Sequence, residues 1–289
     1  MTIPAAPRRP EPRPELAAPR THRVFDGVDS YFEMEYAAVP AFRPLVLDLH
    51  VPVGTQSCPV VVYSHGGGFV GGSRTMGPWA FLLQAGYAVA SVDYRLAAEA
   101  KFPFPIHDLA AAVRWVRANA QQYRLDPGFV IGFGSSAGGY LMNALALTGP
   151  DLPGLTGSLG PTPEVSIVLD AVIDHYAPTD FSTIGVTADS PLIKFLGFDP
   201  TERPDDAELA NLCRYARASS PPFLIAHGNA DTVVDFDQSR RLHEALTNAG
   251  ARAELIVVEG ANHGAVEFDE PAMHQQTLDF LESVAKSRA

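Results

Sequence analysis

One serine between two glycines constrains this chain more than any other feature of its sequence. Residues 134–138 read Gly-Ser-Ser-Ala-Gly and fit the pattern G-x-S-x-G. An apolar run typical of a strand, 129–133, comes directly before them, and a helix of small residues is expected over 137–147. In this setting the turn strains the backbone and lifts the central hydroxyl above a sheet. The pattern predicts Ser136 as a nucleophile, with Ser135 pointing away from the pocket.

The rest of the chain alternates between strand-like and helix-like patterns. Near-continuous apolar strands separated by amphipathic helices are typical of a mostly parallel sheet with helices on both faces. We therefore expect an α/β fold with eight strands, the first two forming a hairpin. The expected strands are 32–37, 45–51, 60–63, 87–92, 129–133, 166–173, 223–226 and 253–258, and the expected helices are 107–120, 137–147, 237–249 and 270–285.

Two segments interrupt this alternation. Residues 1–22 are rich in Pro and Arg, and we expect a disordered or loosely docked N-terminal tail before a single domain over 23–289. Residues 178–222 are rich in Asp, Pro and Ser, with short helical patterns at 192–196 and 207–215. Their place between two expected central strands favours a cap over the carboxyl edge of the sheet, where open α/β sheets bind ligands. The alternative is a long connection without that role.

Composition and charge exclude several classes of function. The chain has 289 residues and a formal net charge of −12, which would repel nucleic acids and anionic membranes. Its two cysteines lack the spacing of a metal site and exclude a disulfide framework. No stretch approaches the about 18 apolar residues that a membrane span needs, nor does the N-terminus read as a signal peptide. We expect a cytoplasmic protein without a metal; a homodimer is compatible with the sequence.

A glycine-rich loop follows the third expected strand. It reads His65-Gly66-Gly67-Gly68-Phe69. Side chains in such a loop would block the approach of a substrate carbonyl, so glycines leave the backbone N–H groups accessible to a developing oxyanion. We expect the oxyanion-binding N–H groups to be those of Gly67, Gly68 and Ala137, and we expect His65 to bond within the loop.

A general base is sought among the histidines that follow Ser136, because this type of site has the chain order Ser, Asp or Glu, His. His227 and His263 both stand near expected strand ends. His263 comes after the last strand and before the last helix, where a loop can return to Ser136. We expect His263 to be the base and His227 to be a loop residue.

The carboxylate that orients the base has three candidates. Asp231 lies in the turn after the seventh expected strand, one loop away from His263. Asp235 stands at the start of a helix, where an Asp usually caps the helix, and Asp174 is a further competitor. We favour Asp231. It would fix the tautomer of His263 during a two-step acyl transfer through Ser136.

Four motifs in this order resemble one known family. The chain is similar to the hormone-sensitive-lipase-like esterases and to bacterial feruloyl and acetylxylan esterase-like hydrolases, from about residue 32 to 280. The resemblance implies the α/β-hydrolase fold and hydrolysis of a small-molecule ester without cofactor or metal. The motifs are HGGGF (65–69), DYRLAAEAKFPFPIHD (93–108), GSSAGG (134–139) and HGNADTVVDFDQS (227–239).

The chain matches the family at the positions of Gly67, Gly68, Ser136, Ala137, Asp231 and His263. Two positions depart from the pattern. Ser135 stands where hormone-sensitive-lipase-like enzymes usually have an acidic residue, which favours the feruloyl-esterase-like branch. Asp235 occupies a place where proline is common.

The reaction itself has alternatives. An amide hydrolase similar to kynurenine formamidase, or an acyltransferase, could use the same three residues, whereas a non-catalytic binding protein of this fold would have lost one of them. For the substrate we expect short-chain or aryl esters. Phe69 and Tyr140 are expected to bind them beside the serine, under aromatic and aliphatic residues of 178–222.

Overall fold

The computed structural model describes residues 24–288 except 41, 55–56, 185–186 and 188. The tail expected over residues 1–22 lies outside the described residues. Among those described, no helix is both long and apolar enough to cross a membrane.

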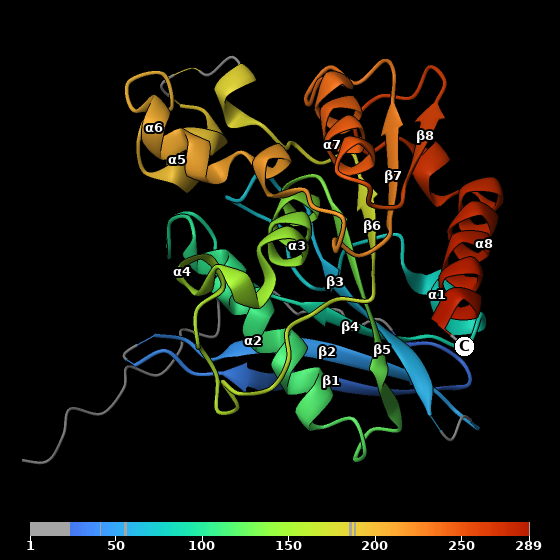
Figure 1. Cartoon of the computed structure of the whole chain (residues 1–289). Coiled ribbons are helices and arrows are strands. Elements are labelled where there is room, and N and C mark those ends of the chain that lie inside the picture. Colours follow the sequence, from blue (N-terminus) through green and yellow to red (C-terminus); the bar gives the residue numbers. More distant parts are fainter. Residues whose placement is uncertain (1–23, 41, 55–56, 185–186, 188, 289) are drawn as a thin grey trace, which may run out of the picture.

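The described residues form eight strands, which join in one sheet in the order β1-β2-β4-β3-β5-β6-β7-β8 (Figure 1). β1 pairs antiparallel with β2 and β2 antiparallel with β4, whereas the remaining pairs are parallel. The predicted mostly parallel sheet and its N-terminal hairpin are thus confirmed. The strands are β1 Val28–Ala37, β2 Leu45–Pro52, β3 Cys58–Ser64, β4 Ala88–Val92, β5 Leu125–Ser135, β6 Ala171–His175, β7 Phe223–Gly228 and β8 Ala253–Val258.

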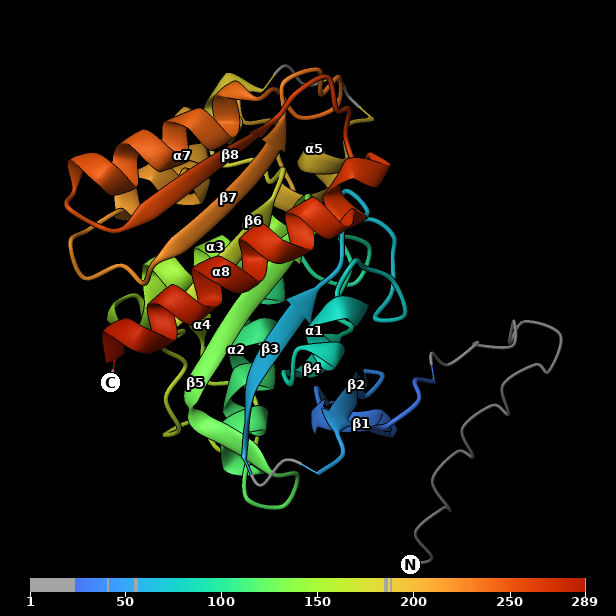
Figure 2. The same ribbon diagram turned by 90° about the vertical axis from the view of Figure 1, so that its right-hand side faces the viewer.

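Helices cover both faces of this sheet, as Figure 2 shows with α8 and α1 in front and α2 and α3 behind. Buried residues of α2, α3 and α7 form one hydrophobic cluster with the sheet, and those of α1 and α8 form a second on the opposite face. The helices are α1 Ala80–Gln84, α2 Phe104–Ala118, α3 Ala137–Thr148, α4 Pro153–Thr156, α5 Pro191–Leu196, α6 Pro204–Ala207, α7 Asp237–Asn248 and α8 Pro271–Arg288.

One strand prediction was displaced along the chain. The run 166–173 was expected as a strand, but β6 begins only at Ala171 and continues to His175. Val168 is half exposed. The backbone N–H of Val130 donates to the side-chain carboxylate of Asp170 and not to the backbone carbonyl of a paired strand. The later end of β6 puts His175 at the carboxyl edge of the sheet.

The insertion between β6 and β7 contains α5, α6 and three short 3-10 turns above that edge (Figure 1). It is fastened to the body by aromatic packing. The Phe195 ring stacks on Phe69 at a centroid distance of 4.0 Å, and the Phe181 ring stacks on Tyr140 at 4.5 Å. The Tyr140 hydroxyl also donates to the carbonyl of Ala210 at 2.9 Å. These four rings are buried.

Candidate active site

The turn from β5 to α3 holds Ser136 in a conformation that few residues adopt. Its φ of 54° and ψ of −122° are unusual for a residue with a side chain and are typical of strained functional positions. α3 begins at the next residue, Ala137. Close packing makes glycine necessary at 138, because a Cβ there would lie 2.1 Å from the carbonyl oxygen of Ser64. The backbone N–H of Ser136 donates to the carbonyl of His175 at 2.8 Å.

His263 and Asp231 meet Ser136 from two other loops. The Nε2 of His263 lies 2.9 Å from the Ser136 Oγ, and its Nδ1 lies 2.7 Å from Asp231 Oδ2. Because an ionised carboxylate accepts hydrogen bonds only, Nδ1 carries the proton and Nε2 accepts the Ser136 proton. The structure therefore brings together the three residues that the sequence singled out, although 127 positions separate His263 from Ser136.

Four hydrogen-bond donors surround Asp231. Besides His263, the Nε2 of His227 lies 3.2 Å from Oδ2, and the backbone N–H groups of Val233 and Val234 donate to Oδ1 at 2.8 and 2.9 Å. Burial alone would raise the pKa of this carboxyl, but the bonds from His227, His263 and the two backbone groups outweigh it. They hold the pKa of Asp231 well below its usual range.

His227 is the first residue whose sequence interpretation was wrong. It belongs to β7 and not to a loop, and its ring is fully buried. Ser239 Oγ lies 2.7 Å from its Nδ1, and Nε2 lies near both the Val234 carbonyl and Asp231. His227 thus helps to hold the Asp231 carboxylate in place through its Nε2.

The competing carboxylates lie elsewhere. Asp235 accepts a hydrogen bond from the N–H of Asp237, the first residue of α7, as expected for an Asp before a helix. Asp174 is buried and accepts bonds from Asn143 and from the N–H of Ala177. Neither carboxylate has a bond to His263.

The glycine loop turns back on itself directly beside Ser136. Gly67 has φ 123°, and a Cβ there would lie 2.2 Å from the carbonyl oxygen of Gly71. The N–H groups of Val70 and Gly71 both donate to the Gly67 carbonyl at 3.1 Å. The prediction that His65 bonds within the loop is confirmed, because its Nδ1 lies 2.7 Å from the Gly66 carbonyl oxygen.

A cavity of about 440 Å³ opens beside the serine. Gly67 and Gly68 line it, together with residues that the sequence did not single out. Its walls are formed by Tyr63, Gly66, Gly67, Gly68, Met76, Gly77, Pro78, Ser135, Ser136, Tyr176, Val233, His263 and Gly264.

Three expectations about the pocket were wrong. Ser135 does not point away: it lines the cavity and accepts a hydrogen bond from the Tyr63 hydroxyl at 3.2 Å. Phe69 and Tyr140 do not line it, because both rings are buried in contacts with the insertion. Phe69 ends the glycine loop and Tyr140 follows Ser136 by four residues, which suggested the pocket for both, but contacts with the insertion bury the two rings.

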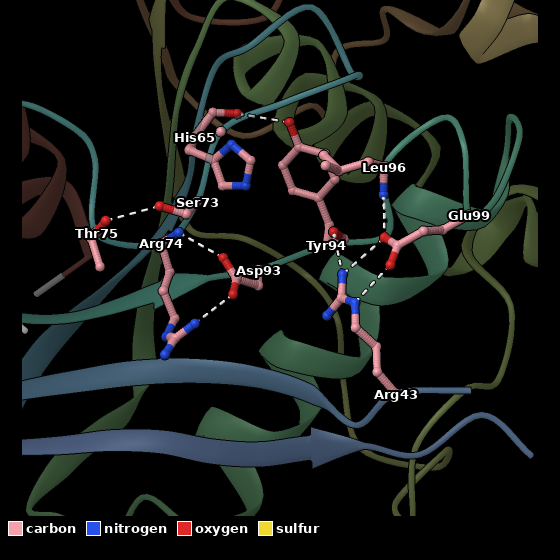
Figure 3. Close-up of a pocket in the computed structure, with 10 residues that line it drawn as sticks. Arg43, His65, Ser73, Arg74, Thr75, Asp93, Tyr94, Leu96 and Glu99 are labelled. Carbon is pink, nitrogen blue, oxygen red and sulfur yellow. Dashed lines mark hydrogen bonds and ion pairs between the residues drawn. The ribbon is translucent and has the colours of Figure 1, made fainter. Parts of the chain in front are cut away.

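A second cavity, of about 400 Å³, is lined by His65 and Gly72 from the glycine loop and by residues that follow it (Figure 3). Charged residues dominate it. The buried Arg74 guanidinium bonds to Asp93, and its Nε donates to Asp48 Oδ1 at 2.7 Å. The Tyr94 hydroxyl donates to the carbonyl of His65 at 2.9 Å, and Arg43 pairs with Glu99 at 2.7 Å. The bonds of Arg74 fasten the chain just after the glycine loop to Asp48 of β2 and to Asp93 directly after β4.

The sheet order, the strained serine between β5 and α3, and the histidine after β8 define an α/β-hydrolase. Comparison with known proteins agrees. The family model described as BD-FAE matches residues 47–246. The chain therefore belongs to the BD-FAE family.

Similar proteins are esterases by name. Esterase LipC of Mycobacterium tuberculosis is 31% identical over 249 residues, which is 81% of this chain but 60% of LipC. Carboxylesterase NlhH of the same species is 32% identical over 75% of this chain and 69% of NlhH. A solved structure titled as a truncated carbohydrate esterase from gut microbiota aligns with a TM-score of 0.84 and 30% identity, covering 89% of this chain and 96% of that one.

Proposed function

We propose that this protein is a serine carboxylesterase in which Ser136 attacks the ester carbonyl. The observation that carries the proposal is the continuous hydrogen-bond chain from Ser136 through His263 to Asp231, at 2.9 and 2.7 Å. His263 takes the serine proton and then gives it to the departing alcohol. Asp231 keeps the ring in the required tautomer and stabilises the imidazolium. The esterase names of similar proteins support the same reaction.

The negative charge of the tetrahedral intermediate needs donors opposite the nucleophile. We assign this role to the backbone N–H groups of Gly67, Gly68 and Ala137, as the sequence predicts. Ala137 is the first residue of α3, so the positive end of the helix dipole adds to its N–H. Gly67 and Gly68 stand in the loop that lines the cavity beside Ser136.

We further propose that residues 178–222 act as a cap that restricts the acyl group. A Cβ at Gly68 would lie 3.3 Å from Pro191, the first residue of α5, so the insertion reaches the oxyanion loop. The stacked rings of Phe69 and Phe195 fill the space behind it. Short acyl chains and aryl esters fit this arrangement. The expected cytoplasmic location, the absence of a nucleic-acid partner and a homodimer stay predictions.

Burst kinetics with p-nitrophenyl acetate test the mechanism. We expect one equivalent of p-nitrophenol in a fast phase and an acetyl group on Ser136 in the mass spectrum of the quenched enzyme. No acylation of Ser136 would reject the proposal. An added alcohol that captures the acetyl group faster than water would identify an acyltransferase, and cleavage of N-formyl anilides in preference to esters an amide hydrolase.

A further inference from the structure

Two histidines contact the same oxygen of Asp231, and the proposed mechanism uses one of them. The Nδ1 of His263 lies 2.7 Å from Oδ2, and the Nε2 of His227 lies 3.2 Å from the same atom. The far nitrogen of each ring meets a serine hydroxyl. For His263 this is the Oγ of Ser136, at 2.9 Å. For His227 it is the Oγ of Ser239 in α7, at 2.7 Å. Asp231 is thus shared by two pairs of serine and histidine.

Burial distinguishes the two pairs. Ser136 and His263 line the cavity of about 440 Å³. The side chains of His227 and Ser239 are fully buried, and neither is among the walls of that cavity. Ser239 therefore has no access to a dissolved ester and is not a second nucleophile. Any effect of the buried pair on the reaction has to pass through Asp231.

The surroundings of His227 fix which of its nitrogens carries the proton. A carbonyl oxygen only accepts hydrogen bonds, and the carbonyl oxygen of Val234 lies 2.9 Å from Nε2. Nε2 therefore carries the proton, and its N–H points to both Val234 and Asp231. In the neutral ring Nδ1 then accepts a hydrogen bond from the Ser239 hydroxyl. The bond at one nitrogen sets the tautomer, so Ser239 keeps the N–H of His227 directed at the carboxylate.

This one N–H acts on both oxygens of Asp231. It approaches Oδ2 directly, and through the Val234 carbonyl it holds the turn whose N–H groups donate to Oδ1. The direct contact also offsets part of the negative charge on the carboxylate. Burial raises the pKa of Asp231, and among the bonds that hold it well below its usual range that from His227 is the largest.

The other elements around His227 bring few charges to it. On the neighbouring strand β6, Asp174 interacts electrostatically with the ring. α7 presents the Ser239 hydroxyl and also Phe236, whose ring meets His227 edge to face at a centroid distance of 5.8 Å. β8 pairs with it at Val257. Within the described part of the chain, Asp231 is therefore the one charged group whose side chain His227 contacts at hydrogen-bond distance.

We propose that His227, oriented by Ser239, is a positioning residue for the proposed ester hydrolysis and that it extends the reaction to lower pH. A protonated His263 cannot take the Ser136 proton, so the rate falls on acidification. Because the N–H of His227 offsets part of the charge on Asp231, it weakens the attraction between that carboxylate and a protonated His263. It also keeps the carboxylate from rotating away from His263. This inference rests on the esterase function proposed above.

A double-mutant cycle with p-nitrophenyl acetate tests whether His227 acts through Asp231. His227→Phe keeps a planar ring but has no donor. It should lower kcat about tenfold, because one hydrogen bond to a charged group is lost, and should leave KM within about twofold. In an Asp231→Asn background the same substitution should cost less than about twofold in kcat. Equal losses in the two backgrounds would mean a general effect on the fold and would overturn the inference.

The pH profile of kcat/KM tests the effect on the charge of Asp231. In His227→Phe the midpoint of the acidic limb should lie roughly half a pH unit higher than in wild type. His227→Gln can place an N–H donor near the position of Nε2, so it should return the midpoint to the wild-type value and recover most of kcat. An unchanged midpoint in His227→Phe, or a glutamine variant that recovers neither quantity, would contradict the proposal.

A matched control is His243→Phe, which makes the same exchange on α7, one helical turn from Ser239. It should change neither kcat nor the midpoint. If His227→Phe does not fold, Ser239→Ala takes its place in the cycle. Its expected loss of kcat is about threefold, and this loss should disappear in the Asp231→Asn background. The proposed function fails separately if wild type neither cleaves p-nitrophenyl acetate nor is labelled by a fluorophosphonate at Ser136.

Discussion

Two cavities of nearly equal volume and opposite character are lined by residues 65–72, which contain the glycine loop. The cavity beside Ser136 is lined by hydroxyls, glycines and apolar side chains, whereas the other is lined by Arg43, Arg74, Asp93 and Glu99. In the second cavity every one of these charged groups has an ion-pair partner. Volume alone therefore does not identify a binding site. The charges of the second cavity are paired within the protein, and we propose that a substrate reacts in the neutral cavity beside Ser136.

The largest expected effect belongs to the neutral cavity. Ser136→Ala should lower kcat by a factor on the order of 10⁶, because removal of the proposed nucleophile leaves only binding and the proposed oxyanion donors. Hydrolysis of p-nitrophenyl acetate and labelling by a fluorophosphonate measure this. The same substitution in the other cavity, Ser73→Ala, should leave both rate and labelling unchanged. Labelling that persists in Ser136→Ala would break the comparison.

The second effect concerns the carboxylate. Asp231→Asn should lower kcat by roughly 10⁴, because the amide no longer fixes the tautomer of His263. Asp235→Asn, which removes only the acceptor before α7, is the control and should cost far less. The kcat values of both variants are measured by steady-state kinetics at pH 8. A greater loss of kcat in Asp235→Asn would identify Asp235 as the carboxylate that orients His263.

The charged cavity should respond in stability. Arg74→Met leaves Asp48 and Asp93 without their buried partner and should lower the free energy of unfolding by about 3–5 kcal/mol. Arg43→Met, which breaks a partly exposed pair with Glu99, should cost less than about 1 kcal/mol. Urea denaturation measures both. Equal losses would mean that burial does not distinguish these two ion pairs.

His175, whose carbonyl accepts the hydrogen bond from the Ser136 N–H, should make the free energy of unfolding depend on pH. Burial lowers the pKa of His175 to about 3, and its ring nitrogens have no partner within the described part of the chain. Between pH 6.5 and 3, this histidine therefore binds a proton in the unfolded chain, where its pKa is about 6.5, but not in the folded chain. Stability due to this ring is complete above pH 6.5 and is lost at about 1.4 kcal/mol per pH unit as pH falls towards 3.

His175→Phe tests this assignment in its aromatic surroundings. The neighbouring Asp174 works in the opposite direction, because burial raises the pKa of its carboxyl to about 6, so the folded state gains stability on acidification through that range. The measured quantity is consequently the difference between variant and wild type. Between pH 7 and pH 5, the variant should lose about 2 kcal/mol less than wild type. Parallel curves would contradict the assignment.

The smallest effect concerns the acyl chain. Each methylene gains about 0.8 kcal/mol only where apolar wall covers it. Since Pro191 borders Gly68 and the ring of Phe195 fills the space behind, kcat/KM for p-nitrophenyl esters should peak at about two to six acyl carbons and then decline. Phe195→Ala should move the peak to longer chains. Activity that rises steadily to twelve carbons or more in wild type would reject the proposed cap.

The sequence predicted those parts of the candidate site that depend on local patterns. The strand–turn–helix setting of Ser136 and the loop positions of Asp231 and His263 are each encoded within a few residues, and the sheet brings these positions to one edge. The placement of Ser135 could not be predicted in the same way. Its partner Tyr63 is 72 positions away and lies on a neighbouring strand, so only the register of the sheet brings them together.

Side chains covered by the insertion were predicted least well. Phe69 and Tyr140 stand next to the glycine loop and to the nucleophile in sequence, yet their rings are buried by contacts with Phe195 and Phe181. The direction of those rings depends on how the insertion folds back, which no local pattern encodes. His175 was missed because the strand was placed too early. The buried charges around Arg74 had no signal in sequence either, since each residue alone reads as a surface charge.

The aromatic packing between the insertion and the body decides how molecules can reach Ser136. Swinging the insertion open would expose Phe69, Tyr140, Phe181 and Phe195, at a cost of roughly 1.5–3 kcal/mol for each ring. This cost disfavours such an open form. We therefore expect a substrate of the proposed esterase to enter at the mouth of the cavity, where Met76 and Val233 are exposed. Accordingly, we expect no rise in the rate of ester hydrolysis when a substrate passes from solution to an oil–water interface.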